Sequence, residues 1–307
     1  MELQQLRYFV AVVEAGGFSR AAARLHVTQP SLSQQIAKLE QELGQPLLDR
    51  LPRGVVPTEA GRRFYERARR VLAELADATR CVADCRQALE GRLIIGAIPT
   101  IAPGLLPGLI AHFIRQHPRV EIEVVEEVTE RLLQRLDEGL IDLALVSTVD
   151  IHTAIHTETL GLEPLGVLVP AGHPFARRRQ LRWQDLEGQK ALVLSELHCL
   201  GRQVNEFCKA RDVRWQVWFH AAHLGTILEM VAQGIGISLV PISFQPIADT
   251  RGCRWIPLQE PVPRREINLL LHNLRYRTRA TLTFADLARQ TVHHAGWTAG
   301  NPHQPTP

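Results

Sequence analysis

The fold at the N-terminal end of the chain is decided by residues 19–44, SRAAARLHVTQPSLSQQIAKLEQELG. Residues 20–26 are mostly strong helix formers, and Ser19 in front of them is a good N-cap. After a turn, Thr28 can cap a second helix, with Pro30 in its first turn, where the missing N–H costs little. The pattern predicts two short helices joined by a tight turn.

The second predicted helix is amphipathic. Apolar side chains recur at spacings of four, three and four residues and form one face: Leu32, Ile36, Leu39 and Leu43. The opposite face carries short polar and basic side chains: Gln29, Ser31, Ser33, Gln34, Gln35 and Lys38. Short polar side chains at a helix start reach base edges and phosphates without bulk, as a helix that reads the major groove requires. Gly44 ends the helix.

A small basic hairpin is predicted after the second helix. Residues 47–50 and 55–56 are its strands, and Arg53 at the tip is placed to meet a phosphate or the minor groove. Residues 1–60 contain six Lys and Arg and six Asp and Glu. The case for a DNA-reading unit therefore rests on the placement of residues and not on net charge.

Residues 1–61 resemble the N-terminal domain of the LysR-type transcriptional regulators. The matched positions are residues 18–22, 28–33, 36, 39–40, 43–44, 47–48, 50 and 58–61. The resemblance implies a winged helix-turn-helix whose partner is double-stranded promoter DNA. It places Gln29, Ser31, Ser33 and Gln34 on DNA, with Arg53 on the wing. We expect four further residues at this interface: Ser19, Thr28, Pro30 and Lys38.

Length and composition are those of an ordinary globular protein. The chain has 307 residues, a formal net charge of +3, 22% charged residues and 45% hydrophobic residues. The length predicts two or three domains with ample core. No apolar run approaches the roughly 20 residues that cross a bilayer, and residues 1–5 lack signal-peptide character. We therefore expect a cytoplasmic protein without a membrane partner, whose five cysteines are reduced at rest.

A long helix is predicted from a Thr58 cap to about Glu90. Its apolar stripe has nearly heptad spacing: Phe64, Ala68, Val71, Leu72, Leu75 and Ala78. About 33 residues would make this helix roughly 50 Å long. A helix of that length with one apolar stripe favours a partner helix, so we predict a dimerisation seam between two copies of the chain.

Beyond Gly91, strands and helices alternate. Strands are predicted at 93–95, 122–125, 143–146, 166–169, 191–194, 215–219, 237–240 and 267–271, and helices at 107–116, 130–138 and 282–290. The pattern is that of an α/β protein with a parallel sheet, and two such lobes suit a ligand between them. LysR-type regulators have such a two-lobed, periplasmic-binding-protein-like effector domain. The predicted domains are 1–58, 59–90 and 91–291, followed by a disordered tail at 292–307.

Two cysteines stand close together in the second lobe. A strand is predicted to end at Leu194 and a helix to begin near Leu200, so Cys199 lies near a helix N-terminus. Such a position, beside His198, favours a thiolate, the form of cysteine that peroxide oxidises. Cys208 shares an apolar face of the helix and should be buried. Nine helical residues separate the two Cα atoms by roughly 13 Å. A disulfide requires less than about 7 Å, so pairing would have to unwind the helix.

This region resembles the OxyR-type peroxide sensors within the LysR family. The matched residues are Thr100, Thr129, His198, Cys199, Leu200, Gln203, Phe207, Cys208, Arg264 and Arg265. The resemblance implies that Cys199 is the peroxidatic thiol and Cys208 the resolving thiol. It also implies a peroxide pocket lined by Thr100, Thr129, His198 and Arg265.

Some positions depart from the OxyR-type pattern. Leu197 replaces a glycine and Gly201 an arginine, and the region of Trp218, His220 and His223 lacks the usual polar residues. The alternative is a LysR-type regulator that binds a small metabolite between its lobes, with Cys199 in the pocket and Cys208 in the core. A solute-binding protein or an enzyme is a third interpretation. The N-terminal unit argues against both, and no acid–base constellation supports an enzyme.

No cofactor or metal site is predicted. His152 and His156 have a spacing seen in zinc sites, but no third ligand is near them in the sequence. The expected partners are promoter DNA and further copies of the chain, as a homotetramer built from two dimers. RNA polymerase is a further candidate partner.

Overall fold

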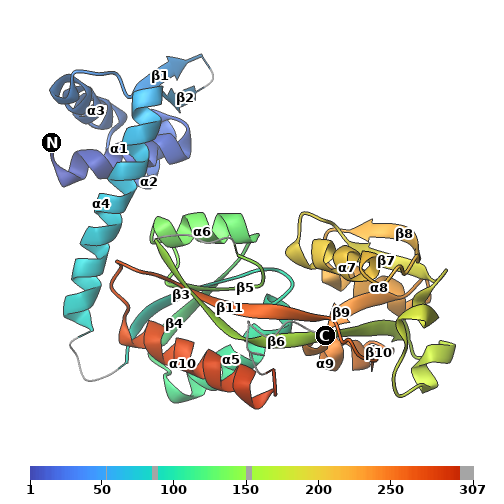
Figure 1. Cartoon of the computed structure of the whole chain (residues 1–307). Coiled ribbons are helices and arrows are strands. Elements are labelled where there is room, and N and C mark those ends of the chain that lie inside the picture. The colour runs from blue at the N-terminus through green and yellow to red at the C-terminus, as the bar shows by residue number, and fades with distance from the viewer. Residues whose placement is uncertain (53, 85–88, 150–153, 298–307) are drawn as a thin grey trace. The chain divides into compact units, whose positions relative to one another are not determined.

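The computed structural model describes residues 1–52, 54–84, 89–149 and 154–297 (Figure 1). The chain divides into two compact units, Met1–Cys85 with Asp137–Leu140, and Arg86–Leu136 with Ile141–Pro307. Within the described ranges, no helix combines the length and the apolar character that a bilayer crossing requires. The mixed α/β architecture is the one that the alternation of strands and helices predicts.

The first unit is a helix-turn-helix followed by a two-stranded wing. Its elements are α1 (Leu3–Ala15), α2 (Phe18–Arg24), α3 (Gln29–Leu43), β1 (Leu48–Leu51), β2 (Gly54–Pro57) and α4 (Glu59–Ala83). Leu32, Ile36 and Leu39 are fully buried, as their spacing predicts. Leu43 is the last residue of α3 and is 38% exposed, so the buried face is one residue shorter than predicted.

The helix caps follow the predictions except at Ser19. Helix α2 begins at the buried Phe18, with Gly17 as its N-cap, so Ser19 lies inside the helix. Thr28 is the N-cap of α3, although its side chain makes no capping bond. Thr58 caps α4, where its Oγ1 accepts from the Gly61 N–H at 2.9 Å.

Helix α4 is shorter than predicted, and only part of its apolar stripe packs against its own unit. Its 25 residues end at Ala83, which corresponds to about 38 Å. Phe64 packs against the core of its own unit, edge-on to the Phe9 ring at 5.3 Å. Val71 and Val82 are 46% and 75% exposed. Only the second half of the stripe is therefore open to a partner helix, and the seam stays a prediction.

The second unit contains two lobes. The first lobe holds β3 (Gly91–Ala97), α5 (Ala102–Gln116), β4 (Val120–Glu126), α6 (Thr129–Asp137), β5 (Leu143–Val146), β11 (Arg264–His272) and α10 (Arg279–His294). Helix α6 covers one face of this sheet, and α5 and α10 cover the other (Figure 1). Pro107 lies inside α5 and not at its start, because the helix begins five residues earlier and buries Leu105 and Leu106.

The second lobe is built around the far half of β6 (Ile155–Pro170). Its other elements are β7 (Lys190–Leu194), α7 (Cys199–Lys209), β8 (Gln216–Ala221), α8 (Leu224–Ala232), β9 (Ser238–Pro241), α9 (Gln245–Asp249) and β10 (Cys253–Pro257), with 3-10 turns at Pro174–Arg177, Trp183–Leu186 and Ile242–Phe244. Each lobe encloses its own hydrophobic cluster. The sequence patterns do not predict α8, α9 or β10.

The main sheet is mixed, which corrects the expectation of a parallel sheet. Its order is β10-β6-β11-β5-β3-β4, and β9 also pairs with β6. Strand β3 runs parallel to β4 and β5, but β11 is antiparallel to both of its neighbours, β5 and β6. A parallel connection needs a crossover, whereas the returning strand β11 enters the sheet beside β5 from the opposite direction.

The C-terminal end of the second unit is longer than predicted. Helix α10 continues to His294, and Val292 and Trp297 are buried. The Trp297 carbonyl accepts from the Leu162 N–H at 3.0 Å, so residues 292–297 are packed against β6. Residues 298–307 of the predicted tail lie outside the described residues.

Gly61→Ala should destabilise the first unit, because a Cβ at this position would lie 1.9 Å from the Leu47 carbonyl oxygen. Overpacking of this kind costs about 1–3 kcal/mol of unfolding free energy, measured by urea titration. Gly108→Ala is the matched helical control, because nothing lies within 4 Å of its Cβ position. Equal unfolding midpoints for both variants and the wild type would contradict the packing of α4 on the wing.

Candidate functional site

The start of α3 presents most of the predicted DNA-facing side chains to solvent. Exposed residues there and just before it are Thr28, Gln29, Pro30, Ser31, Gln34 and Lys38. Ser33 is half-buried, and Ser19 on α2 is exposed, with its Oγ 3.5 Å from Gln29 Oε1. Arg53 lies outside the described residues. Because the apolar face of α3 is buried, the polar side chains of its N-terminal turn face the solvent, which contact with a major groove requires.

Two arginines that the sequence patterns did not place at the interface flank this surface. Arg50 on β1 donates from Nη2 to Ser33 Oγ at 3.3 Å, and its guanidinium lies 4.8 Å from the centre of the Phe18 ring. Arg20 donates to the carbonyl oxygens of Ala15 and Gly16 at 2.6 and 2.9 Å. These contacts hold both cations in place. Arg20 and Arg50 are 30 positions apart in the sequence and come together only in the fold, so their spacing along the chain does not indicate a shared site.

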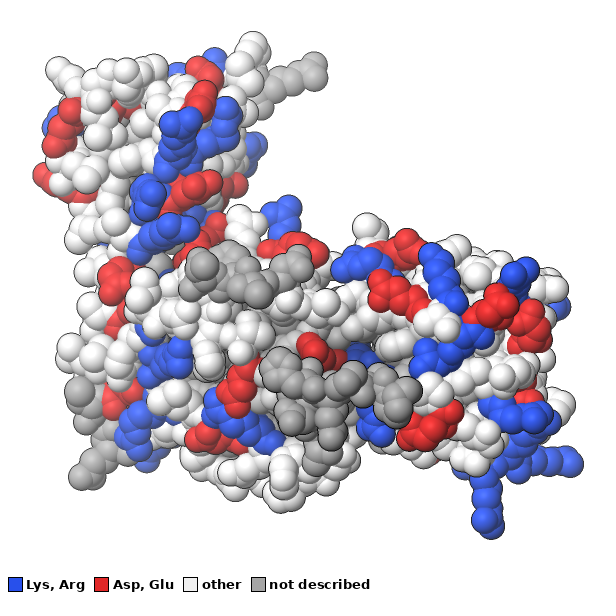
Figure 2. Space-filling view, viewed as in Figure 1, with Lys and Arg blue, Asp and Glu red and all other residues white. Residues whose placement is uncertain are grey.

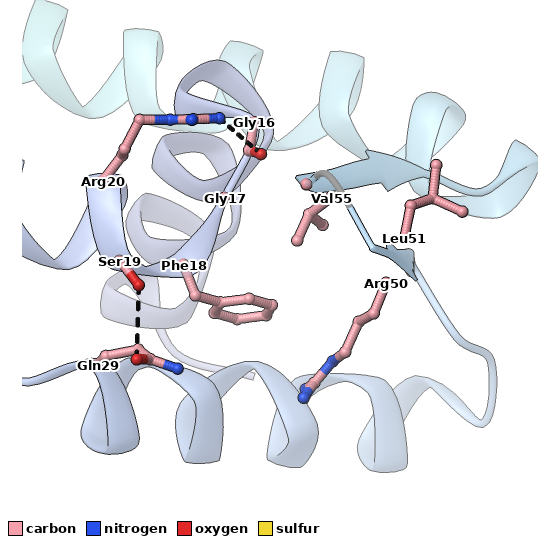
Figure 3. A pocket seen from close by; sticks show the side chains of 10 residues that line it. Gly16, Gly17, Phe18, Ser19, Arg20, Gln29, Arg50, Leu51 and Val55 are labelled. Atoms are coloured by element: carbon pink, nitrogen blue, oxygen red, sulfur yellow. Dashed lines mark hydrogen bonds between the residues drawn. The ribbon is translucent and has the colours of Figure 1, made fainter.

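A cavity of about 400 Å³ lies between α2, the first residue of α3 and the wing (Figure 3). Its lining residues are Gly16, Gly17, Phe18, Ser19, Arg20, Gln29, Arg50, Leu51, Gly54 and Val55. On the face seen in Figure 2, acidic and basic side chains are interleaved, without one continuous basic surface. Residues 1–60 contain equal numbers of basic and acidic residues, so DNA contact by this unit depends on individually held side chains more than on a broad positive field.

The second candidate site is helix α7, which carries Cys199 and Cys208. His198 is the N-cap and Cys199 the first residue of the helix, as predicted. Both thiols are free and buried, with exposed fractions of 7% and 4%. Cys199 belongs to the hydrophobic cluster of the first lobe, whereas Cys208 belongs to that of the second. One helix thus places its two thiols in two different cores.

The surroundings of Cys208 keep its thiol protonated. Burial raises the pKa of Cys208 to about 11, and the nearby Arg211 guanidinium opposes this shift only in part. A neutral thiol is a poor nucleophile. In the reduced protein Cys208 should therefore react slowly for as long as it stays in the core.

Two of the four predicted pocket residues contact each other. Arg265 donates from Nη1 to Thr100 Oγ1 at 3.0 Å and from Nη2 to the Thr100 carbonyl at 2.9 Å. His198 and Thr129 are half-buried at the starts of α7 and α6. Among the described residues, no side-chain hydrogen bond joins either of them to Thr100 or Arg265. The contact between Arg265 and Thr100 is thus established, and the pocket of four residues stays a prediction.

Gln203 connects α7 with the first lobe. Its Nε2 donates to Thr148 Oγ1 at 2.9 Å and lies 3.4 Å from Ser147 Oγ, just after β5. The sequence patterns matched Gln203 without assigning it a role.

Gly201, which departs from the OxyR-type pattern, packs α7 against the end of β7. A Cβ there would lie 2.5 Å from the Leu194 and Ser195 carbonyl oxygens.

No metal site is evident where the structure describes the chain, because no three His, Cys, Asp or Glu side chains gather to hold an ion. His156 is exposed on β6, and His152 lies outside the described residues.

Comparison with known proteins assigns the two units to one family. Residues 3–62 match the bacterial regulatory helix-turn-helix proteins of the lysR family, and residues 86–292 match the LysR substrate binding domain. The chain belongs to the LysR family. This LysR-family chain is a DNA-binding transcriptional regulator and not an enzyme, since its family and its relatives are transcriptional regulators.

Relatives of this LysR-family chain include activators named for peroxide. It is 39% identical over 271 residues to the hydrogen peroxide-inducible genes activator of Dickeya chrysanthemi, covering 88% of this chain and 89% of the relative. It is 37% identical to the DNA-binding transcriptional dual regulator OxyR of Escherichia coli strain K12, with coverage of 88% and 89%.

Solved OxyR structures have the same fold. A full-length OxyR mutant from Pseudomonas aeruginosa superimposes with a TM-score of 0.77 at 31% identity, covering 94% of this chain and 95% of that one. A peroxide-bound OxyR mutant from Corynebacterium glutamicum gives a TM-score of 0.61 at 31% identity, with coverage of 96% and 95%. The likeness spans both units.

Gln34→Ala should weaken sequence-specific DNA binding by roughly 1–3 kcal/mol, because it removes an exposed amide in the first turns of α3. Fluorescence anisotropy with a duplex that the wild-type chain selects from a random pool measures the effect. Gln41→Ala is the control, since Gln41 is an exposed glutamine near the other end of the same helix. Equal losses from the two variants would mean that α3 does not enter the groove by its N-terminal end.

Cys208 in the folded, reduced protein should react with iodoacetamide at pH 8 roughly a hundredfold more slowly than in urea, because its pKa moves from 9.0 to about 11. Peptide mass spectrometry follows the modification. The unfolded chain loses this proton first as pH rises, so the Cys208 contribution to stability falls between about 9 and about 11. Equal alkylation rates in the folded and unfolded chain would refute the protected thiol.

Proposed function

We propose that this chain is a transcriptional regulator that responds to hydrogen peroxide through Cys199 and Cys208. The observation that carries the proposal is the placement of both thiols on α7, in separate hydrophobic clusters. The peroxide-related names of relatives that are 37–39% identical to the chain support it. Cys199 is the peroxidatic thiol in this proposal, and Cys208 is the resolving thiol.

The chemistry has two steps. The Cys199 thiolate attacks one oxygen of hydrogen peroxide, an S–O bond forms, the O–O bond breaks, and hydroxide leaves and takes up a proton to become water. Cys199 is then a sulfenic acid, oxidised by two electrons. The Cys208 thiolate attacks the Cys199 sulfur, the S–S bond forms and the S–O bond of the sulfenic acid breaks. The departing hydroxide takes up a proton and leaves as a second water. Thr100, Thr129, His198 and Arg265 are the proposed pocket residues.

The second step requires a change of structure. Nine helical residues hold the two Cα atoms about 13 Å apart, whereas a disulfide needs less than about 7 Å. Helix α7 must therefore unwind, and Cys208 must leave the core of the second lobe. Unwinding would also strain or break the bond from Gln203 to Thr148, which joins α7 to the first lobe. Oxidation would thus alter both lobes together.

DNA binding and assembly complete the proposal. The exposed Val71 and Val82 on α4 support a dimer seam, and two dimers would form the homotetramer. The DNA-facing set is Ser19, Thr28, Gln29, Pro30, Ser31, Ser33, Gln34, Lys38 and Arg53. RNA polymerase at a promoter is the proposed further partner, and the cytoplasm is the proposed location.

Low-dose peroxide should produce a Cys199–Cys208 disulfide, because sulfenic acid at Cys199 makes its sulfur the target for the second thiol. Non-reducing peptide mapping by mass spectrometry measures the product. Cys199→Ser should abolish the disulfide, whereas Cys253→Ala, at a buried cysteine in the core of the second lobe, should preserve it.

Failure of the wild-type chain to form the disulfide would overturn the peroxide proposal. Thermal-shift assays with small metabolites then examine the alternative effector. A metabolite response that survives in the Cys199→Ser variant would favour that alternative.

A further inference from the structure

Arg265 and Glu163 form an ion pair that is removed from water. They lie directly opposite each other on the antiparallel strands β11 and β6. Their side chains are 0% and 1% exposed, and Glu163 Oε2 lies 2.8 Å from Arg265 Nε and 2.7 Å from Nη2. A buried charge pair is tolerated only when its remaining hydrogen-bonding groups are also satisfied. The partners of those groups are therefore informative.

The remaining hydrogen-bonding atoms of Glu163 and Arg265 bind two other segments of the chain. Glu163 Oε1 accepts from the Ser243 N–H at 2.9 Å, and Arg265 donates from Nη1 and Nη2 to the hydroxyl and carbonyl oxygens of Thr100. Ser243 is itself held in place by α5, because a Cβ on Gly104 would lie 2.5 Å from Ser243 Oγ. The carboxylate is thus anchored on both oxygens, and the guanidinium has one orientation.

We infer that Glu163 is a positioning residue of the proposed peroxide site, which fixes Arg265 and through it orients the Thr100 hydroxyl. The inference rests on the proposed function. Because Thr100 Oγ1 accepts from the guanidinium, its single hydroxyl proton is left to donate elsewhere. The adjacent positive charge polarises that hydroxyl and strengthens it as a donor.

A held donor of this kind suits the first chemical step. Negative charge moves onto the departing peroxide oxygen as the S–O bond forms, and an oriented hydroxyl donor stabilises such charge without reorganisation. Glu163 itself does not contact the peroxide in this scheme. Its role is to keep the guanidinium from turning away from Thr100.

The test is a double-mutant cycle between Glu163→Gln and Thr100→Val in the reduced full-length chain. Glu163 uses one oxygen for Arg265 and the other for the Ser243 N–H, whereas glutamine offers a single, uncharged acceptor. Glutamine therefore cannot satisfy both partners, and Arg265 loses its ionic anchor. The Cys199 oxidation rate is followed by peroxide pulse, alkylation and mass spectrometry. Each single variant should slow oxidation on the order of tenfold or more, and the double variant should be no slower than Thr100→Val.

Glu158→Gln is the matched control. Glu158 is also on β6 and also binds an arginine through both oxygens, Arg289 at 2.8 and 2.7 Å. This pair lies at the α10 face, away from Thr100, so oxidation should keep its wild-type rate. A wild-type rate in Glu163→Gln, or effects of the two variants that multiply, would overturn the inference.

Unfolding in urea of the wild type, Glu163→Gln, Thr100→Val and the double variant separates this inference from the proposed function. The network requires that the effects of Glu163→Gln and Thr100→Val on the urea midpoint be non-additive, whatever Cys199 does. If wild-type Cys199 does not react with peroxide, the proposed function fails, and the positioning role of Glu163 in oxidation falls with it. Non-additive midpoints would then retain the structural network alone.

Glu163→Asp provides a second variant if Glu163→Gln does not fold. The shorter carboxylate keeps the charge but is one methylene too short to reach both Arg265 and the Ser243 N–H, so Cys199 in this variant should oxidise more slowly than in the wild type. A rate as high as that of the wild type would overturn the inference.

Discussion

Strand β6 is the constraint on which the second unit depends. Its first residues join the core of the first lobe through β11, and residues 165–169 form the core of the second lobe beside β9 and β10. One continuous strand cannot slip against its neighbours without moving every side chain to the other face. The two lobes therefore share a fixed register at their junction, where Glu163 and Arg265 are placed.

Helix α7 packs against both lobes at this junction. Its first residue, Cys199, packs into the core of the first lobe, while Leu200, Val204 and Cys208 pack into the second. Gln203 adds a polar bond to Thr148 across the same boundary. A local change in α7 therefore acts on both lobes, which is a physical requirement for a sensor whose output lies in another unit of the chain.

DNA binding by the first unit depends on cationic side chains in fixed positions more than on net charge. Basic and acidic residues are equal in number over residues 1–60, so non-specific attraction to the phosphate backbone is weak. The structure compensates with cations that are held in place, Arg50 by Phe18 and Ser33, and Arg20 by the carbonyls that end α1. Pairing of two such units would add the affinity that one alone lacks.

The sequence by itself determined the local elements and the family. Periodic apolar residues in α3, the Thr58 cap and the position of Cys199 at a helix start depend on contacts within a few residues, and these predictions agree with the structure. Where contacts between distant residues set the bounds or the packing of an element, the local patterns gave a wrong prediction or none. Ser19 is not a cap because the buried Phe18 begins α2, and α4 divides its stripe because Phe64 meets the core.

Only the tertiary structure decided the partners of the buried charges. Arg265 and Thr100 are 165 positions apart, and Glu163 is 102 positions from Arg265. No periodicity links such residues, because strand pairing across the sheet, and not spacing along the chain, brings them into contact. The sequence thus pointed to the two thiols and to a helix with a polar N-terminal turn, and the fold determined that Glu163, Arg265 and Thr100 contact one another.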